Sequence, residues 1–245
     1  MTASTPVSTF AATASQYGCS LPAVQQARAF RPTRLPGFLA FLGAFLMLFS
    51  FAAPASARTL RVVALGDSLT AGYMLPGDAA FPAQLEKALK AKGLDVEIAN
   101  AGVSGDTASQ GLARLDWSVP DGTDAVIVEL GANDALRGID PAITRKALDE
   151  ILTRLKARGI PAMIAGMYAP RNMGADYIQA FDGLFPALAA KHGAPLYPFF
   201  LDGIAGDRRL NLNDGLHPNP EGVKIIVQRI APSVAAFLAG VKPGA

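Results

Sequence analysis

After residue 58 the chain alternates between short apolar runs and longer segments with apolar residues at helical spacing. Short apolar runs bounded by turn residues are typical of strands that are buried on both faces of a sheet. We expect strands over 60–65, 96–99, 125–130, 161–166 and 196–199. The segments between them predict helices over 83–92, 107–115, 141–159, 175–192 and 221–238.

Strands that alternate with helices imply a parallel sheet with helices on both of its faces. The pattern therefore predicts an α/β fold of three layers, α/β/α, around a central parallel sheet of about five strands. No repeat or linker divides this part of the chain. Ligands of such sheets bind beyond the carboxyl ends of the strands, so we expect the functional residues there.

The first 57 residues have a different character. Arg28, Arg31 and Arg34 precede an uncharged apolar run over 38–51, which is followed by the Ala-Ser-Ala sequence ending at Ala57. An apolar run of this length is too short to span roughly 30 Å of hydrocarbon, and small residues in this pattern are typical of a signal-peptide cleavage site. We therefore predict cleavage after Ala57.

Two segments follow from this prediction: residues 1–57 as an N-terminal extension with a signal peptide, and residues 58–245 as a single catalytic domain. A cleaved signal implies a periplasmic or secreted protein with no stable membrane span. The alternative is an uncleaved anchor, in which residues 52–57 lengthen the apolar run toward the roughly 20 residues that spanning requires.

Charge and cysteine content exclude several classes of function. The chain has 22 Lys and Arg against 20 Asp and Glu, and a near-neutral balance gives no reason to expect a nucleic-acid partner. The single cysteine, Cys19, cannot form a disulfide or a cysteine-based metal site within the chain. The spacing of Asp202, Asp207 and Asp214 matches no calcium loop. We expect no metal and no cofactor, and nothing in the sequence specifies an oligomeric state.

Polar and glycine-containing segments follow four of the expected strands and should converge on one edge of the sheet. They are Gly-Asp-Ser-Leu at 66–69, Asn-Ala-Gly-Val-Ser-Gly-Asp-Thr at 100–107, Gly-Ala-Asn-Asp at 131–134 and Asn-Asp-Gly-Leu-His-Pro at 213–218.

These residue types suit acyl transfer. A serine hydroxyl attacks a carbonyl when an imidazole removes its proton and a carboxylate holds the other ring nitrogen, which are roles open to Ser68, His217 and Asp214. The oxyanion that forms needs fixed donors. The backbone N–H groups of Ser68 and Gly105 and the side-chain amide of Asn133 could supply them.

Together the four segments resemble the blocks of the GDSL/SGNH hydrolase family over nearly the whole of 58–245. The resemblance implies the SGNH-hydrolase, flavodoxin-like fold, Ser68 as nucleophile, a triad completed by Asp214 and His217, and an oxyanion hole of Ser68, Gly105 and Asn133. Residues 104–115 and 128–138 are similar to the bacterial periplasmic branch of acyl-thioesterases, lysophospholipases and arylesterases, although Ala132 stands where that branch has a second glycine.

Other polar residues receive structural interpretations. We expect Asp67 and Asp134 to brace loops, and Asp106 to cap the helix after it. His192 precedes Gly193 at an expected helix end and is interpreted as a residue of the last helical turn. Ser104 is disfavoured as a nucleophile, because Asp106 stands where the Gly-x-Ser-x-Gly elbow requires its last glycine.

Apolar residues near the expected rim suggest the substrate. Met167, Tyr168 and Pro170 follow the fourth strand, and Met74 comes soon after Ser68. By resemblance, the stretch after the fourth strand closes over an acyl chain, whereas the simpler interpretation is that Met167 and Tyr168 cover the sheet edge.

The predicted function is hydrolysis of a small-molecule acyl or aryl ester, extending to acyl thioesters and lysophospholipids, by a serine esterase that forms an acyl-enzyme. One alternative is a carbohydrate acetylesterase. The other is a non-catalytic protein that uses the same rim to bind a lipid.

Overall fold

The computed structural model of the protein describes residues 58–242. The expected signal peptide and its cleavage site lie outside the described residues. Within 58–242, none of the helices combines the length and the apolar character needed to cross a bilayer.

A parallel sheet of five strands runs through the centre of the fold in the order β2-β1-β3-β4-β5. The strands are β1 (Leu60–Gly66), β2 (Val96–Gly102), β3 (Ala125–Glu129), β4 (Ala162–Ala165) and β5 (Leu196–Tyr197). The α/β prediction is confirmed, and each expected strand is present. The strand prediction works best for β3 and β4, because strands buried on both faces of a sheet are mostly apolar.

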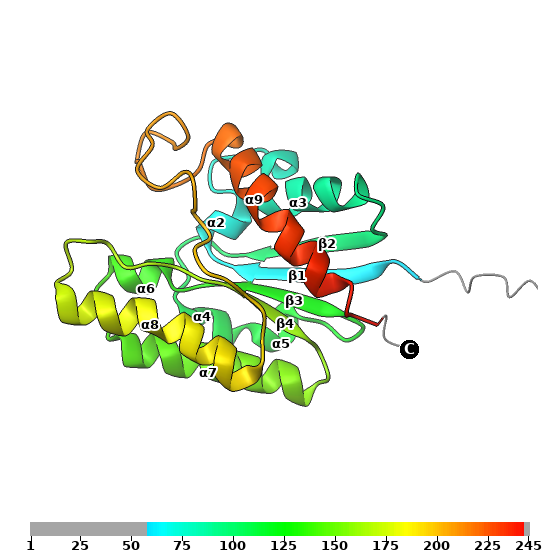
Figure 1. The fold of residues 1–245 in the computed structure, drawn as a ribbon, viewed down its shortest axis with the longest axis horizontal. Coiled ribbons are helices and arrows are strands. Elements are labelled where there is room, and N and C mark those ends of the chain that lie inside the picture. Colours follow the sequence, from blue (N-terminus) through cyan, green and yellow to red (C-terminus); the bar gives the residue numbers. More distant parts are fainter. Residues whose placement is uncertain (1–57, 243–245) are drawn as a thin grey trace, which may run out of the picture. The chain divides into compact units, whose positions relative to one another are not determined.

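Helices cover both faces of the sheet, with α3 and α9 on one side and α4, α7 and α8 on the other (Figure 1). The helices are α2 (Ser68–Ala71), α3 (Phe81–Lys90), α4 (Ala108–Ala113), α5 (Leu115–Ser118), α6 (Ala132–Leu136), α7 (Pro141–Ala157), α8 (Ala175–His192) and α9 (Pro220–Leu238), with a 3₁₀ turn, η1 (Gly77–Ala79). The three layers of the prediction are therefore present.

The long helices begin and end at local signals. Asp140 caps α7 and Asn219 caps α9, each accepting backbone N–H groups, and a proline at the first helical position follows each cap. Helix α8 ends at Gly193, whose φ of 64° is left-handed and costs a glycine little.

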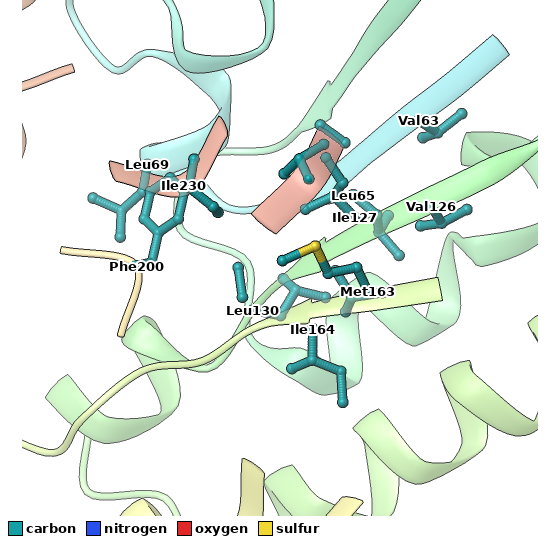
Figure 2. Packing of buried hydrophobic residues seen from close by; sticks show 14 of the residues in the cluster. Val63, Leu65, Leu69, Val126, Ile127, Leu130, Met163, Ile164, Phe200 and Ile230 are labelled. Carbon is teal, nitrogen blue, oxygen red and sulfur yellow. The ribbon is translucent and has the colours of Figure 1, made fainter. Parts of the chain in front are cut away.

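The core lies between the sheet and the helix layers. Figure 2 shows Leu65 of β1, Ile127 of β3 and Ile164 of β4 among the side chains of this core, together with Ile230 of α9 and Phe200. All five side chains are at most 2% exposed. This packing fixes the strands rigidly and so fixes the positions of the loops that leave their ends.

The carboxyl ends of β2, β1 and β3 are level. In the sheet register Gly66 lies opposite both Gly102 of β2 and Glu129 of β3. The buried guanidinium of Arg114 binds these ends together, because it donates to the backbone carbonyls of Gly66 at 2.8 Å and Ala101 at 2.9 Å.

Arg114 also accounts for a difference from prediction. The single helix expected over 107–115 is instead two short helices, α4 and α5, that meet at Arg114, where φ is −108° and ψ is 8°. The break turns the guanidinium toward the strand ends, a long-range contact that helical spacing along the sequence cannot reveal.

Candidate active site

Ser68 is the first residue of α2, the one-turn helix that starts where β1 ends. Asp67 caps this helix by accepting the backbone N–H of Leu69 at 2.9 Å. Gly66 makes the tight turn possible, because a Cβ there would lie 2.0 Å from Oγ1 of Thr70 and 2.8 Å from the carbonyl of Glu129. Strand β1 therefore delivers Ser68 to the rim of the sheet, where it is 7% exposed.

His217 and Asp214 lie in the loop before α9 and meet Ser68 across this rim. Nε2 of His217 lies 2.9 Å from Oγ of Ser68, and Nδ1 lies 2.6 Å from Oδ2 of Asp214. A carboxylate can only accept, so Nδ1 carries the proton and Nε2 is left to accept from the serine hydroxyl. The structure thus brings the three predicted residues into one hydrogen-bonded chain.

The carboxylate of Asp214 is held from two sides. Oδ1 accepts the backbone N–H groups of Leu216 at 2.9 Å and His217 at 3.0 Å, and Oδ2 accepts the imidazole N–H. Partial burial opposes ionisation, but these hydrogen bonds outweigh it and lower the pKa of Asp214 to about 2. Asp214 is therefore ionised at any pH where an imidazole can act as a base.

Tyr73 is a neighbour of His217 that the sequence did not reveal. Its ring centroid lies 4.4 Å from that of the imidazole, with the planes tilted by 36°. The backbone N–H of Tyr73 donates to the carbonyl of Ser68 at 3.1 Å, so the residue is fixed to the same turn as the serine. Tyr73 covers one face of the imidazole and restricts its rotation.

Gly105 and Asn133 reach the same edge from the loop after β2 and from α6, the short helix after β3. Gly105 has a φ of 89°, and its carbonyl accepts from Nη2 of Arg137 at 2.8 Å. Nδ2 of Asn133 donates to Oδ2 of Asp67 at 3.1 Å and to the carbonyl of Asp106 at 3.0 Å. The amide of Asn133 is therefore oriented by two acceptors.

Two backbone N–H groups at the carboxyl edge of the sheet are unpaired in the described part of the chain. Within residues 58–242, the backbone N–H groups of Ser68 and Gly105 have no hydrogen-bond acceptor. Unpaired N–H groups next to a serine hydroxyl are suited to receive an oxyanion.

The carboxylates expected to act structurally do so, but one of them differs from the prediction. Asp134 accepts from Oγ1 of Thr144 at 2.8 Å and from the backbone N–H of Ala108 at 2.9 Å, and so braces two helices. The expectation that Asp106 caps α4 is wrong, because Thr107 is the cap. Asp106 instead forms an ion pair with Arg114 at 2.6 Å.

An apolar cavity of about 540 Å³ opens beside the serine and the imidazole. Met167, Tyr168 and Pro170 line it as expected, and Tyr168 stacks on Phe199 with centroids 4.6 Å apart. Leu136 and Leu216 also line the cavity, although the sequence gave no reason to select them.

Met74 does not belong to this cavity. Its side chain is 78% exposed, and it lines a separate hollow together with Tyr73 and Asp214. Its φ of 57° turns the chain away after Tyr73, so the prediction that Met74 lies with Met167 and Tyr168 is wrong. Met74 is close to Ser68 in the sequence, but its position in the sequence does not show on which side of His217 it lies.

A parallel sheet whose carboxyl edge carries a serine–histidine–aspartate chain over an apolar cavity is the arrangement of a serine hydrolase for acyl substrates. Comparison with known proteins agrees. The sequence profile of the GDSL-like lipase/acylhydrolase family matches residues 64–225, and the chain belongs to this family.

Named relatives lie within the same family. The chain is 39% identical over 188 residues to thioesterase 1/protease 1/lysophospholipase L1 of Escherichia coli K12, covering 76% of this chain and 88% of that protein. It is 36% identical over 194 residues to an arylesterase of Vibrio mimicus, covering 79% and 97%. The crystal structure of AlinE4, an SGNH-hydrolase family esterase, superposes with a TM-score of 0.62 at 44% identity, covering 74% and 97%.

Proposed function

We propose that this protein is a serine esterase that hydrolyses acyl or aryl esters through an acyl-enzyme on Ser68. The observation that carries the proposal is the continuous chain from Ser68 through His217 to Asp214, with distances of 2.9 Å and 2.6 Å, at the mouth of an apolar cavity. Membership of the lipase/acylhydrolase family and the names of its relatives support the same class, a carboxylic ester hydrolase.

In the acylation step, Oγ of Ser68 attacks the ester carbonyl carbon while Nε2 of His217 accepts the hydroxyl proton. Asp214 holds the Nδ1 proton and stabilises the imidazolium that forms. The carbonyl oxygen becomes an oxyanion, for which the unpaired backbone N–H groups of Ser68 and Gly105 are donors. The amide of Asn133 joins them by sharing one of its two N–H groups, which it donates to Asp67 and to the carbonyl of Asp106. The bond to the alcohol oxygen then breaks, and the imidazolium protonates the departing alkoxide.

Deacylation repeats these steps with water. Nε2 accepts a proton from the water, the hydroxide attacks the acyl carbon, and the same donors stabilise the second oxyanion. When the bond to Oγ breaks, the imidazolium returns its proton to Ser68 and the carboxylic acid leaves. Apart from the ester and one water molecule, no group outside the chain is needed to balance either step.

The cavity indicates the acyl part of the substrate. Its volume of about 540 Å³ exceeds what an acetyl group fills, and Leu136, Met167 and Leu216 give it an apolar lining. This favours longer acyl or aryl esters over the acetyl group of a modified sugar. We extend the proposal to acyl thioesters and lysophospholipids, which the name of the E. coli relative supports.

We also propose that the protein is exported and acts in the periplasm or outside the cell. The support is the sequence of the N-terminal segment, with three arginines, an apolar run and the Ala-Ser-Ala pattern ending at Ala57. Sequencing the N-terminus of the protein isolated from its host tests this. We expect Arg58 as the first residue, whereas a retained segment would support the anchor.

The decisive experiment combines covalent labelling with a substrate panel on the mature chain. A fluorophosphonate should add to Ser68, as peptide mass spectrometry would locate, and nitrophenyl esters, a lysophospholipid and an acyl-CoA should be hydrolysed with different efficiencies. Absence of both an adduct and turnover would contradict the proposal and favour a lipid-binding protein. A strong preference for acetyl over eight-carbon esters would favour the acetylesterase.

A further inference from the structure

Glu129, the last residue of β3, is a buried acid that the mechanism does not use. Its side chain is fully buried, and Oε2 accepts from Oγ1 of Thr70 at 2.8 Å. Oε1 is among the buried side-chain atoms that have no hydrogen-bond partner in residues 58–242. A buried carboxylate oxygen without a partner is costly, so a proton on it, able to make a hydrogen bond, would resolve the cost.

The carboxyl group of Asp67 lies against Glu129 and is the natural acceptor. Asp67 is also fully buried, and it connects two parts of the candidate site. Oδ1 accepts the backbone N–H of Leu69 in the helix that carries the serine, and Oδ2 accepts the amide of Asn133. Both bonds require Asp67 to be an acceptor, which a carboxylate is and a protonated acid only partly is.

The surroundings supply too little positive charge for two carboxylates. Asp134 on α6 acts on Asp67 as a further anion, and the imidazole of His217, in the loop before α9, also acts on it electrostatically. The guanidinium of Arg114 is near but donates to Asp106, Ser118 and backbone carbonyls, not to Glu129. Two buried anions in contact cannot both persist without a cation, so the pair retains one proton.

The environment of each carboxyl decides where that proton resides. Burial and the neighbouring Asp67 raise the pKa of Glu129 well above its ordinary value. Burial also raises the pKa of Asp67, to about 6, but the hydrogen bonds from Leu69 and Asn133 oppose this rise. Two donors to Asp67, against an unpartnered oxygen on Glu129, favour the proton on Glu129 and the charge on Asp67.

We propose that Glu129 is a positioning residue that stays protonated at neutral pH and donates a hydrogen bond to Asp67. Held in this way, Asp67 fixes the position of the Asn133 amide relative to the helix that carries Ser68. The role of Glu129 rests on the proposed function, since Asn133 matters there as an oxyanion donor. Ionisation of Glu129 would place two negative charges side by side and weaken the hydrogen bonds that Asp67 accepts from Leu69 and Asn133.

Activity measurements on three variants test this role. Glu129→Ala removes the donor and should lower kcat by tenfold or more with little change in KM, because an oxyanion donor acts mainly in the transition state. Glu129→Gln keeps a neutral donor and should restore kcat to within about threefold of wild type. Asp67→Asn puts an amide N–H where Asp67 must accept, so it should lower kcat as Glu129→Ala does.

Glu97→Gln on β2 is the matched control, because that glutamate is exposed and remote from Ser68. It should leave kcat unchanged. Equal kcat values for Glu129→Ala and Glu129→Gln would overturn the proposal. The proposal would also be overturned if Asp67→Asn left kcat unchanged while Glu129→Gln lowered it. That result would place the proton on Asp67.

Equilibrium unfolding tests the proton without using activity. The unfolded chain releases the Glu129 proton near its ordinary pKa of 4.5, whereas the folded chain keeps it. The unfolding equilibrium constant of wild type relative to Glu129→Gln should therefore rise with pH above 4.5, by up to about tenfold per pH unit. A ratio that stays constant with pH would contradict the proposal. Because this measurement needs no turnover, it stands even if Ser68 fails to react with a fluorophosphonate.

Discussion

Two histidine–aspartate pairs with the same short contact occupy different parts of the molecule. His217 and Asp214 lie 2.6 Å apart at the carboxyl edge of the sheet, and His192 and Asp149 lie 2.6 Å apart where α8 packs on α7. In the first pair Asp214 binds Nδ1 and leaves Nε2 directed at Ser68. In the second, Asp149 binds Nε2 itself and also accepts from Lys191 at 2.6 Å.

The difference shows that the pair alone does not make a catalytic base. His192 is the last residue of α8, as its place before Gly193 predicts, and with Lys191 it ties two helices together. His217 differs because a hydroxyl and unpaired N–H groups meet it at the end of the sheet. His217 can act as a base because it lies at the carboxyl edge of the sheet, whereas His192 lies between two helices and has a structural role.

The largest effect should come from removing the hydroxyl while leaving both pairs intact. Ser68→Ala should lower kcat by about 10⁶-fold, since no nucleophile remains for the base to activate. Hydrolysis of a nitrophenyl ester measures this, and intact mass after fluorophosphonate treatment should show no adduct. Residual turnover near wild type would mean that another residue is the nucleophile.

Exchanging each histidine separates the two pairs directly. His217→Ala should lower kcat nearly as much as Ser68→Ala, because the serine proton then has no acceptor. His192→Ala should leave kcat/KM unchanged and lower the free energy of unfolding by about 1 kcal/mol, the loss of one hydrogen bond. Ester hydrolysis and urea unfolding of both variants distinguish these outcomes, and more than a few per cent activity in His217→Ala would argue against its role.

The two carboxylates can be compared in the same way. Asp214→Asn should lower kcat by about 10⁴-fold, because an amide no longer selects the tautomer with a free Nε2. Since the pKa of Asp214 is lowered to about 2, wild type should show no loss of activity from this group down to that pH.

Asp149→Asn should affect stability alone. Hydrogen bonds from Lys191 and then His192 lower the pKa of Asp149 below its ordinary value of 3.8. The contribution of such a group to stability is present above that value and is lost as the pH falls through the folded pKa. The difference in unfolding free energy between Asp149→Asn and wild type should thus be below about 1 kcal/mol at pH 7 and vanish in acid, with kcat unchanged.

Among variants of the triad and of the oxyanion donors, the smallest loss of kcat is expected for Asn133. Asn133→Ala should lower kcat by about 10²-fold and leave KM nearly constant, because the oxyanion exists only after attack. Steady-state kinetics on one ester measure this. A raised KM with unchanged kcat would instead assign Asn133 to substrate binding.

The fold was largely predictable because its strands are mostly apolar and its long helices carry local end signals. Helix α8 was predicted to the residue, since Gly193 ends it. The one-turn helices α2 and α6 were missed, because four or five residues are too few to show an apolar period.

The site was predictable where chemistry and strand ends coincide, as at Ser68, Asn133 and His217. It was not predictable where contacts join distant segments. Tyr73 contacts the ring of His217, which lies far from it in the sequence. In the sequence, Glu129 is only the polar end of an apolar strand. Asp106 and Thr107 are both good capping residues, and only the position of Arg114 decides between them.

The loop that carries Asp214 and His217 is closed on itself by short-range bonds. The backbone N–H of Leu212 donates to the carbonyl of His217 at 2.7 Å, and Asn211 and Pro218 form an isolated antiparallel bridge. The acid and the base are thus built as one small hairpin, and a displacement of that hairpin would carry both together. Such a displacement would break the 2.9 Å contact between His217 and Ser68 and leave the contact between His217 and Asp214 intact.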